Sequence, residues 1–313
     1  MTAQLEPAIR VHDLTKNYGS VTAVDRLSFD VARGEVFGLL GPNGAGKTTT
    51  VRMLCRLIAP TNGDGSILGY DLRSSSNSRD IRKRIGLVPD NVGLYEELSA
   101  YENLDYFGKL HECPVQVRKK RIEYYLDRFD LFEKRHVAVG EFSKGMKQKL
   151  SLARAMIHDP ELLFLDEPTA NLDPESARAV TTLIRELKDR GKTVFLNTHN
   201  LGEAERLCDR VGILSTKLMV LDTPEALRRS VWGSKTIVEL DQISRDMTGM
   251  LERAYSGKVS FDGNTATFEV EDPERENPDI VSTIVAAGGR VRFVTKLNPA
   301  FEDTYMKIVG RSL

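Results

Sequence analysis

Residues 41–48 read Gly41-Pro42-Asn43-Gly44-Ala45-Gly46-Lys47-Thr48 and are followed by Thr49. The apolar run Val36–Leu40 precedes them, and a segment with helical periodicity begins at Thr49. Between a strand and a helix, such glycines let backbone N–H groups converge on phosphate oxygens at the positive end of the helix dipole. Lys47 would reach the outer phosphates and the Thr48 hydroxyl would hold Mg²⁺. The motif predicts a nucleoside triphosphate site rather than a glycine-rich turn with a solvated lysine.

The composition is typical of a globular chain without a strong charge bias. The 313 residues include 44 basic and 45 acidic side chains, so no global field favours nucleic acid or anionic lipid. The sequence contains no apolar run near the ~18 residues of a membrane span, and residues 1–7 do not resemble a cleaved signal. Cys55, Cys113 and Cys208 are widely spaced, which favours reduced thiols in a cytosolic protein.

Two more apolar runs end in polar residues of chemical interest. Leu162–Leu165 is followed by Asp166 and Glu167, and Thr193–Thr198 is followed by His199. Runs of this kind predict strands of a parallel sheet that is buried on both faces, and ligands gather at the carboxyl ends of such strands. Adjacent acids at this place are costly unless they serve a metal ion or a proton. We therefore expect a Mg²⁺-and-base pair beside a functional histidine.

Weaker signals come from a second helix start and from a turn. Ser143 is a good N-cap for a helix that runs to Ile157, and Gly145 frees the backbone at its first turn. This helix end could accept phosphate, but an ordinary capped helix is the better explanation of this segment taken alone, because caps are common. Tyr18 lies in a turn that could fold over the site, although turn tyrosines are usually surface or packing residues.

The remaining elements follow from periodicity. Short strands are expected within residues 8–33, a turn-rich segment at 62–66, a strand at 85–89 and helices across 98–136. From about residue 232 the pattern is β-α-β-β-α-β, with a polar loop at 273–278, a helix at 279–287 and a closing helix at 298–309. This order predicts a small ferredoxin-like sandwich with no catalytic constellation.

The phosphate loop, serine-capped helix, acid pair and histidine, in this order and spacing, resemble the nucleotide-binding subunits of ABC transporters. The resemblance implies an α/β fold with a mixed sheet, an N-terminal antiparallel β subdomain and a helical subdomain at about 91–157. It implies an ATP-binding domain at 1–231 and an accessory α+β domain at 232–313, for which regulation, dimer stabilisation and a passive cap remain open.

The resemblance also assigns roles. Tyr18 matches the aromatic that stacks on adenine, and Ser143 and Gly145 match the signature motif that contacts the γ-phosphate of a nucleotide held by the other subunit. Asp166 matches the aspartate that organises Mg²⁺, Glu167 the general base, Asp173 the dimer-contact loop and His199 the switch histidine.

Two positions depart from the family pattern. The signature reads Phe142-Ser143-Lys144-Gly145-Met146 instead of Leu-Ser-Gly-Gly-Gln, a variant that resembles the drug- and lipid-exporting ABC-2-type branch. Asp90 stands where a glutamine usually helps to bind Mg²⁺ and signals to the membrane partner. An aspartate still offers an oxygen to Mg²⁺, but it adds negative charge near the γ-phosphate. Asn91 offers an amide one residue later, and the sequence does not decide between these alternatives.

The resemblance implies an ATPase that uses ATP and Mg²⁺, works as a dimer with a second copy or a homologous subunit, and lies on the cytoplasmic face of the membrane. Its membrane partner would be a separate integral permease that docks beside residues 90–95, and no nucleic acid partner is expected. An uptake ATPase and a soluble ABC-type ATPase acting on ribosomes or DNA are the alternatives. The second of these is disfavoured because the chain has one such domain, no heptad insert and no net basic charge.

Overall fold

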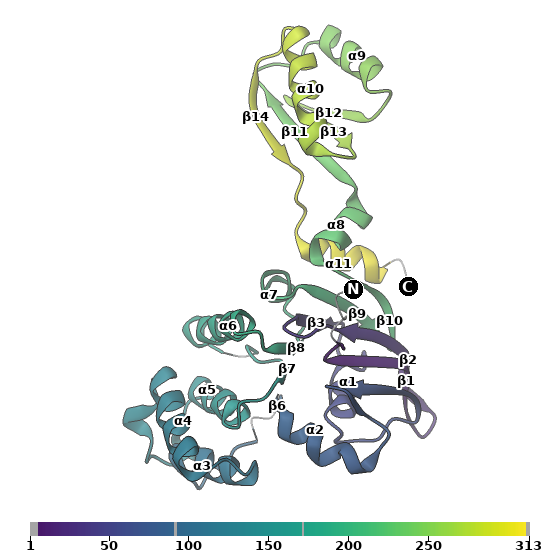
Figure 1. Cartoon of the computed structure of the whole chain (residues 1–313). Helices are drawn as coiled ribbons and strands as arrows, with labels where there is room; N and C mark the ends of the chain where they lie inside the picture. Colours follow the sequence, from purple (N-terminus) through teal and green to yellow (C-terminus); the bar gives the residue numbers. More distant parts are fainter. Residues whose placement is uncertain (1–5, 91–92, 171, 311–313) are drawn as a thin grey trace, which may run out of the picture. The chain divides into compact units, whose positions relative to one another are not determined.

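The computed structural model in Figure 1 describes residues 6–90, 93–170 and 172–310. The chain divides into two compact units, Met1–Thr223 and Pro224–Leu313. Helix α8 (Pro224–Trp232) therefore belongs to the second unit, although the sequence analysis placed it at the end of the first domain. Asn91, whose amide is an alternative to the Asp90 carboxylate in the sequence analysis, lies outside the described residues, as does Asn171.

The first unit contains an antiparallel sheet with the strand order β2-β1-β4-β5. These strands are β1 (Ile9–Tyr18), β2 (Val21–Val31), β4 (Asn62–Ile67) and β5 (Tyr70–Asp71). β2 joins what periodicity suggested were two short strands, because register shifts let one long strand follow β1. β4 was expected to be a turn-rich segment. It is a strand because its backbone pairs with β1.

The central sheet of the first unit has six strands in the order β10-β9-β3-β8-β7-β6. Its members are β3 (Val36–Leu40), β6 (Ile85–Val88), β7 (Leu162–Asp166), β8 (Thr193–Asn197), β9 (Arg210–Ser215) and β10 (Lys217–Asp222). All adjacent pairs are parallel except β10 with β9. Every residue of β3, β7 and β8 is buried, as expected for strands covered on both faces.

The described part of the first unit contains seven α-helices. They are α1 (Lys47–Leu54), α2 (Ser78–Arg84), α3 (Ala100–Leu110), α4 (Val115–Arg128), α5 (Lys144–Met156), α6 (Pro174–Asp189) and α7 (Leu201–Leu207). Ser99 and Glu102 form a reciprocal capping box at the start of α3. α3 packs against α4 and α5, and these three helices form the group below α6 in Figure 1.

The core of the first unit lies where the two sheets face each other. Phe29 of β2 stacks on Phe37 of β3 with ring centroids 5.2 Å apart, and Phe37 contacts Phe195 of β8 at 5.4 Å. Phe164 of β7 extends the group, with its ring centroid 5.4 Å from that of Phe195. Offset and tilted pairs of this kind add to the free energy gained by burying the rings themselves. The packing fixes the three adjacent strands that carry the polar residues described below.

The second unit has the ferredoxin-like order that its sequence pattern predicted. Its antiparallel sheet runs β12-β13-β11-β14, with α9 and α10 packed on it (Figure 1). The elements are β11 (Ser234–Leu240), α9 (Arg245–Ala254), β12 (Val259–Asp262), β13 (Thr265–Val270), α10 (Pro273–Ala286), β14 (Val291–Lys296) and the closing helix α11 (Phe301–Gly310). The polar loop expected at residues 273–278 is instead the beginning of α10. Asp272 caps that helix, which continues through Pro278 and buries Ile280 and Ile284.

Within the described residues, none of the helices has both the length and the apolar character that a membrane crossing requires.

Candidate functional site

A pocket of about 250 Å³ lies at the carboxyl ends of β3, β7 and β8, which are neighbours in the central sheet. Crevices at this edge of parallel sheets are where such folds bind ligands. The pocket combines the phosphate loop, both acids of the pair and two further polar residues. It is lined by Ala23, Asn43, Gly44, Ala45, Gly46, Lys47, Thr48, Thr49, Asp90, Asp166, Glu167 and Asn197.

Gly46 is required by the geometry of the loop. Its φ of 98° lies in the left-handed region, where side chains are strained. A Cβ at this position would lie 2.3 Å from the carbonyl oxygen of Ala23 on β2. The glycine therefore lets the loop turn into α1 directly against the neighbouring sheet, with Lys47 at the first helical position.

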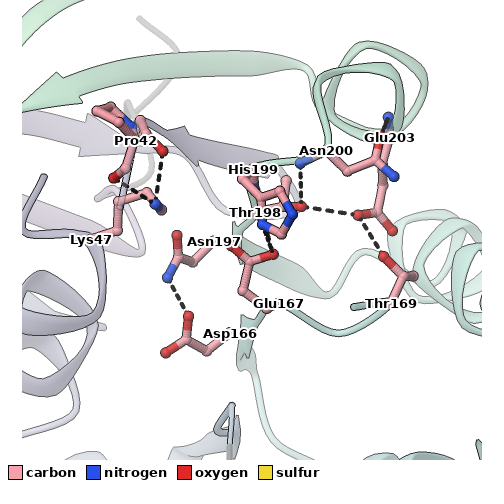
Figure 2. A network of polar contacts seen from close by, with 11 residues as sticks. Pro42, Lys47, Asp166, Glu167, Thr169, Asn197, Thr198, His199, Asn200 and Glu203 are labelled. Atoms are coloured by element: carbon pink, nitrogen blue, oxygen red, sulfur yellow. Dashed lines mark hydrogen bonds and ion pairs between the residues drawn. The ribbon is translucent and has the colours of Figure 1, made fainter. Parts of the chain in front are cut away.

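Lys47 holds the loop closed through its side chain. Its Nζ donates hydrogen bonds to the carbonyl oxygens of Gly41 at 2.8 Å and Pro42 at 3.1 Å (Figure 2). Burial lowers the pKa of Lys47, and the charges of Glu167 and Asp166 oppose this shift. A buried ammonium group in the first turn of a helix is placed to receive an anionic ligand. Gly41 and Pro42 accept these hydrogen bonds through their carbonyl groups, and they are not among the residues that line the pocket.

Asp166 ends β7 and is buried, with 4% of its surface exposed. Burial raises the pKa of Asp166, and hydrogen bonds from Asn197 and Thr48 lower it. The charges of Asp90 and Glu167 raise it further, so these acids are close enough to interact. A buried carboxylate with acidic neighbours is costly without a cation.

Asn197 is a pocket residue that the sequence analysis overlooked. It pairs in register with Asp166 across β7 and β8, and its amide Nδ2 donates a hydrogen bond to Asp166 Oδ1 (Figure 2). Its Oδ1 is buried and has no hydrogen-bond partner among the described residues. The available signal was a polar residue closing an apolar strand opposite the acid pair.

Glu167 and His199 lie against each other just beyond β7 and β8. His199 Nδ1 lies 2.8 Å from Glu167 Oε2, and the His199 backbone N–H donates to the same oxygen at 3.4 Å. Glu167 adopts a φ of 49°, and its backbone N–H donates to the carbonyl of Asn197 at 2.8 Å. Strained backbone of this kind is often found at functional sites. The structure thus brings together the acid and the histidine that the sequence singled out.

Ser143 and Gly145 lie outside this pocket. Ser143 caps α5, and its Oγ accepts a hydrogen bond from the backbone N–H of Met146. A Cβ at Gly145 would lie 2.5 Å from Ser176 Oγ and 3.2 Å from Asp173 Oδ2, so the glycine lets the N-termini of α5 and α6 approach closely. Gln148 of α5, which the sequence analysis did not single out, donates a hydrogen bond from Nε2 to the carbonyl of Pro168 at 2.9 Å. These contacts tie the start of α5 to the segment after Glu167.

Tyr18 ends β1 and is 48% exposed, with the Lys16 ammonium 5.1 Å from the centre of its ring. It does not line the pocket, whereas Ala23 of the adjacent strand β2 does. Tyr18 therefore presents a partly exposed aromatic ring on the sheet that borders the phosphate loop.

The donor set of the pocket suits Mg²⁺. No group of three or more His, Cys, Asp or Glu side chains in residues 6–90, 93–170 and 172–310 is arranged to hold a metal ion by itself. Mg²⁺ is usually held by one or two protein oxygens together with water and substrate phosphates. Thr48, Asp90 and Asp166 offer such oxygens in one pocket, and Asn197 adds a buried oxygen without a partner.

Comparisons with known proteins identify the family of the chain. The ABC transporter family profile matches residues 24–170. The chain is 37% identical to the Nod factor export ATP-binding protein I of Rhizobium sp. (strain N33), over 98% of each chain. It is 34% identical to the daunorubicin resistance ATP-binding protein DrrA3 of Streptomyces coeruleorubidus, over 97% of this chain and 96% of that one. A solved ATP-binding subunit of an ABC transporter is 33% identical, with a TM-score of 0.67 over 71% of this chain and 92% of its own. The chain belongs to the ABC transporter family, as an ATP-binding subunit that hydrolyses ATP.

Proposed function

We propose that this chain powers an exporter by binding and hydrolysing ATP in the pocket at the ends of β3, β7 and β8. The observation that carries the proposal is the convergence of the phosphate loop, Asp166, Glu167 and the Glu167–His199 contact at this edge. Export rather than uptake is favoured by the relatives, whose names describe an export protein and a drug-resistance protein. Similarity over nearly the whole chain extends this support to the C-terminal unit.

The phosphate loop would bind the triphosphate. Backbone N–H groups of residues 43–49 at the start of α1 would bind phosphate oxygens, and Lys47 would exchange its bonds to Gly41 and Pro42 for bonds to the outer phosphates. Tyr18 would stack on the adenine ring from the end of β1. The loop and Lys47 then oppose the charge that develops on the transferred phosphoryl group.

The metal site would use Thr48, Asp166 and Asp90, with Asn197 orienting Asp166. Bound Mg²⁺ would neutralise phosphate charge. Asn197 donates to one oxygen of Asp166, which leaves the other oxygen for the metal or its water shell.

Glu167 would act as the general base on the attacking water. Glu167 lines the pocket together with Lys47, and its backbone adopts a φ of 49°. His199 would leave Glu167 to bond the γ-phosphate, which frees the carboxylate to polarise water. The 2.8 Å contact between the two side chains is the bond that His199 would give up.

Each ATP would lie between two copies of the chain, or between this chain and a homologous subunit. The pocket of a single chain includes neither Ser143 nor Gly145. The start of α5 is nevertheless a capped helix N-terminus that suits an anion. A second subunit would bring its own α5 to the open side of the phosphate site, and ATP would then join the two subunits.

The permease would dock in a groove of about 750 Å³ beside Pro89, from the cytoplasmic face of the membrane. Leu57 and Leu110 line this groove and are 54% and 63% exposed. Arg79, Arg82, Lys83 and Arg154 also line it, together with Glu112, which forms ion pairs with Arg79 and Lys83. An apolar floor with basic side chains suits a short amphipathic segment of a membrane protein.

The docking proposal predicts the effect of two substitutions in the groove. Leu57→Asp with Leu110→Asp should abolish co-purification of a polytopic permease from solubilised membranes, because carboxylates replace exposed apolar contacts. ATP hydrolysis by the isolated subunit should stay within about twofold of the parent, because surface changes rarely disturb the fold. Val115→Asp is the control, since Val115 is 53% exposed and lies outside the groove. Retained co-purification of the doubly substituted chain would place the dock elsewhere.

A second prediction concerns Asp90. Asp90→Gln should tighten ATP binding without Mg²⁺ by roughly threefold to tenfold, because it removes a charge that repels the triphosphate. Mg²⁺ should then strengthen ATP binding less than it does in the parent chain. Calorimetry with a slowly hydrolysed ATP analogue gives the dissociation constant with and without Mg²⁺, and the ratio of the two constants measures the effect of Mg²⁺. Glu97→Gln, an exposed acid nearby, is the control. An unchanged ratio would remove Asp90 from the metal and phosphate site.

A further inference from the structure

Glu203 is a buried carboxylic acid that the proposed hydrolysis does not use. It lies in α7, four residues after His199, and only 1% of its surface is exposed. Burial raises the pKa of Glu203, hydrogen bonds from Thr169 and Thr198 lower it, and the charge of Glu167 raises it further. A buried carboxyl group costs stability compared with an apolar residue unless its bonds compensate.

Its hydrogen bonds connect the two strand ends that carry the reactive side chains. Glu203 Oε2 accepts a bond from Thr169 Oγ1 at 3.0 Å and another from Thr198 Oγ1 at 3.2 Å (Figure 2). Thr169 follows Glu167 by two residues, and Thr198 directly precedes His199. One oxygen of Glu203 therefore connects the segment after Glu167 to the segment that ends at His199.

The bridge has a rigid support on its own helix. Asn200 caps α7, with Oδ1 accepting from the Glu203 backbone N–H at 3.0 Å. The Asn200 N–H donates to Thr198 Oγ1, also at 3.0 Å. The other carboxylate oxygen, Oε1, is buried and has no hydrogen-bond partner within the described part of the chain. A group kept only for stability would be expected to satisfy both of its oxygens.

We infer that Glu203 is a positioning residue that holds Glu167 and His199 in register through Thr169 and Thr198. The inference rests on the proposed roles of Glu167 and His199. A displacement of a reacting group by about 1 Å can lower the rate of the chemical step about 10²-fold. Loss of the bridge therefore lowers kcat for ATP hydrolysis and leaves ATP binding, which depends on the phosphate loop, unchanged.

The test compares Glu203→Ala with Glu203→Gln, Thr169→Val and Thr198→Val in the full chain. Rates are normalised to the protein that binds a slowly hydrolysed ATP analogue, so that unfolded material does not count. Glu203→Ala should lower kcat about 10-fold to 100-fold with KM for ATP within about twofold. Glu203→Gln should recover most of kcat, because an amide oxygen accepts the same two bonds. The Thr169→Val/Thr198→Val pair should match Glu203→Ala, and adding it to Glu203→Ala should cause no further loss.

Glu35 supplies the matched control for a purely structural effect. It is also buried, with its Oε2 accepting from the Ala32 N–H at 2.6 Å, but it is not a pocket residue. Glu35→Ala should lower the melting temperature with little change in kcat of the folded fraction. An unchanged kcat in Glu203→Ala, a Gln variant as slow as Ala, or an equal loss of kcat in Glu35→Ala would each overturn the inference. Full activity in Glu167→Gln would instead overturn the proposed role of Glu167 as the base. The two variants therefore distinguish a failure of the Glu203 inference from a failure of the proposed function.

Discussion

Glu167→Gln lowers kcat for ATP hydrolysis by about three orders of magnitude and leaves ATP binding intact, if Glu167 is the base. Glutamine keeps the shape of the side chain and an oxygen that can accept the His199 N–H bond, but it cannot take up a proton. Loss of a general base typically costs between 10²-fold and 10⁴-fold in rate. Lys47, with 7% of its surface exposed, would also lose one of its two acidic neighbours, which favours retention of the triphosphate.

The same variant should keep ATP bound without hydrolysing it, and a second measurement can detect this through the association of subunits. The Glu167→Gln variant with ATP and Mg²⁺ should elute as a dimer in size-exclusion chromatography, because hydrolysis no longer removes the ATP that joins the two subunits. The parent chain should return to monomer as ATP is consumed. Glu252→Gln, an exposed acid in α9, is the control and should behave like the parent. Normal turnover by Glu167→Gln would require another base, and absence of the dimer would separate ATP binding from subunit association.

Much of the site could be predicted because its signals are local. The run before Gly41, the acid pair after Leu165 and the histidine after Thr198 each follow an apolar segment that is buried on both faces. Parallel strands place their carboxyl ends at one edge, so the pocket follows once these strands are neighbours. Ser143 was recognisable as a cap for the same reason: the bond that a cap makes lies within three residues.

The parts that escaped prediction depend on contacts between distant segments. Residues 62–66 have turn composition, and only the pairing with β1 makes them a strand. Pro278 suggested that the helix began after it, but Asp272 caps the helix earlier and the buried face continues through the proline. Gln148 and Glu203 are common residue types whose roles become visible only when their partners are located.

A mixture of two inactive variants should recover ATP hydrolysis if the site is shared between subunits. Lys47→Ala removes the phosphate ligand, and Ser143→Arg blocks the start of α5, so each homodimer should be nearly inactive. In a mixed dimer, the intact phosphate loop of the Ser143→Arg chain faces the intact α5 of the Lys47→Ala chain. A 1:1 mixture that exchanges freely should approach about one quarter of the parent rate, because half of the dimers carry one complete site of two.

The matched control mixes Lys47→Ala with Glu167→Gln. Both of these residues belong to the same pocket of one chain, so every site in that mixed dimer keeps one defect and activity should stay low. The geometry makes the distinction sharp, because Lys47 and Glu167 line one pocket and Ser143 does not. Recovery in the first mixture alone would place α5 of one subunit on the ATP of the other. If mixed dimers form, as shown by two affinity tags, and neither mixture recovers activity, the shared site is wrong.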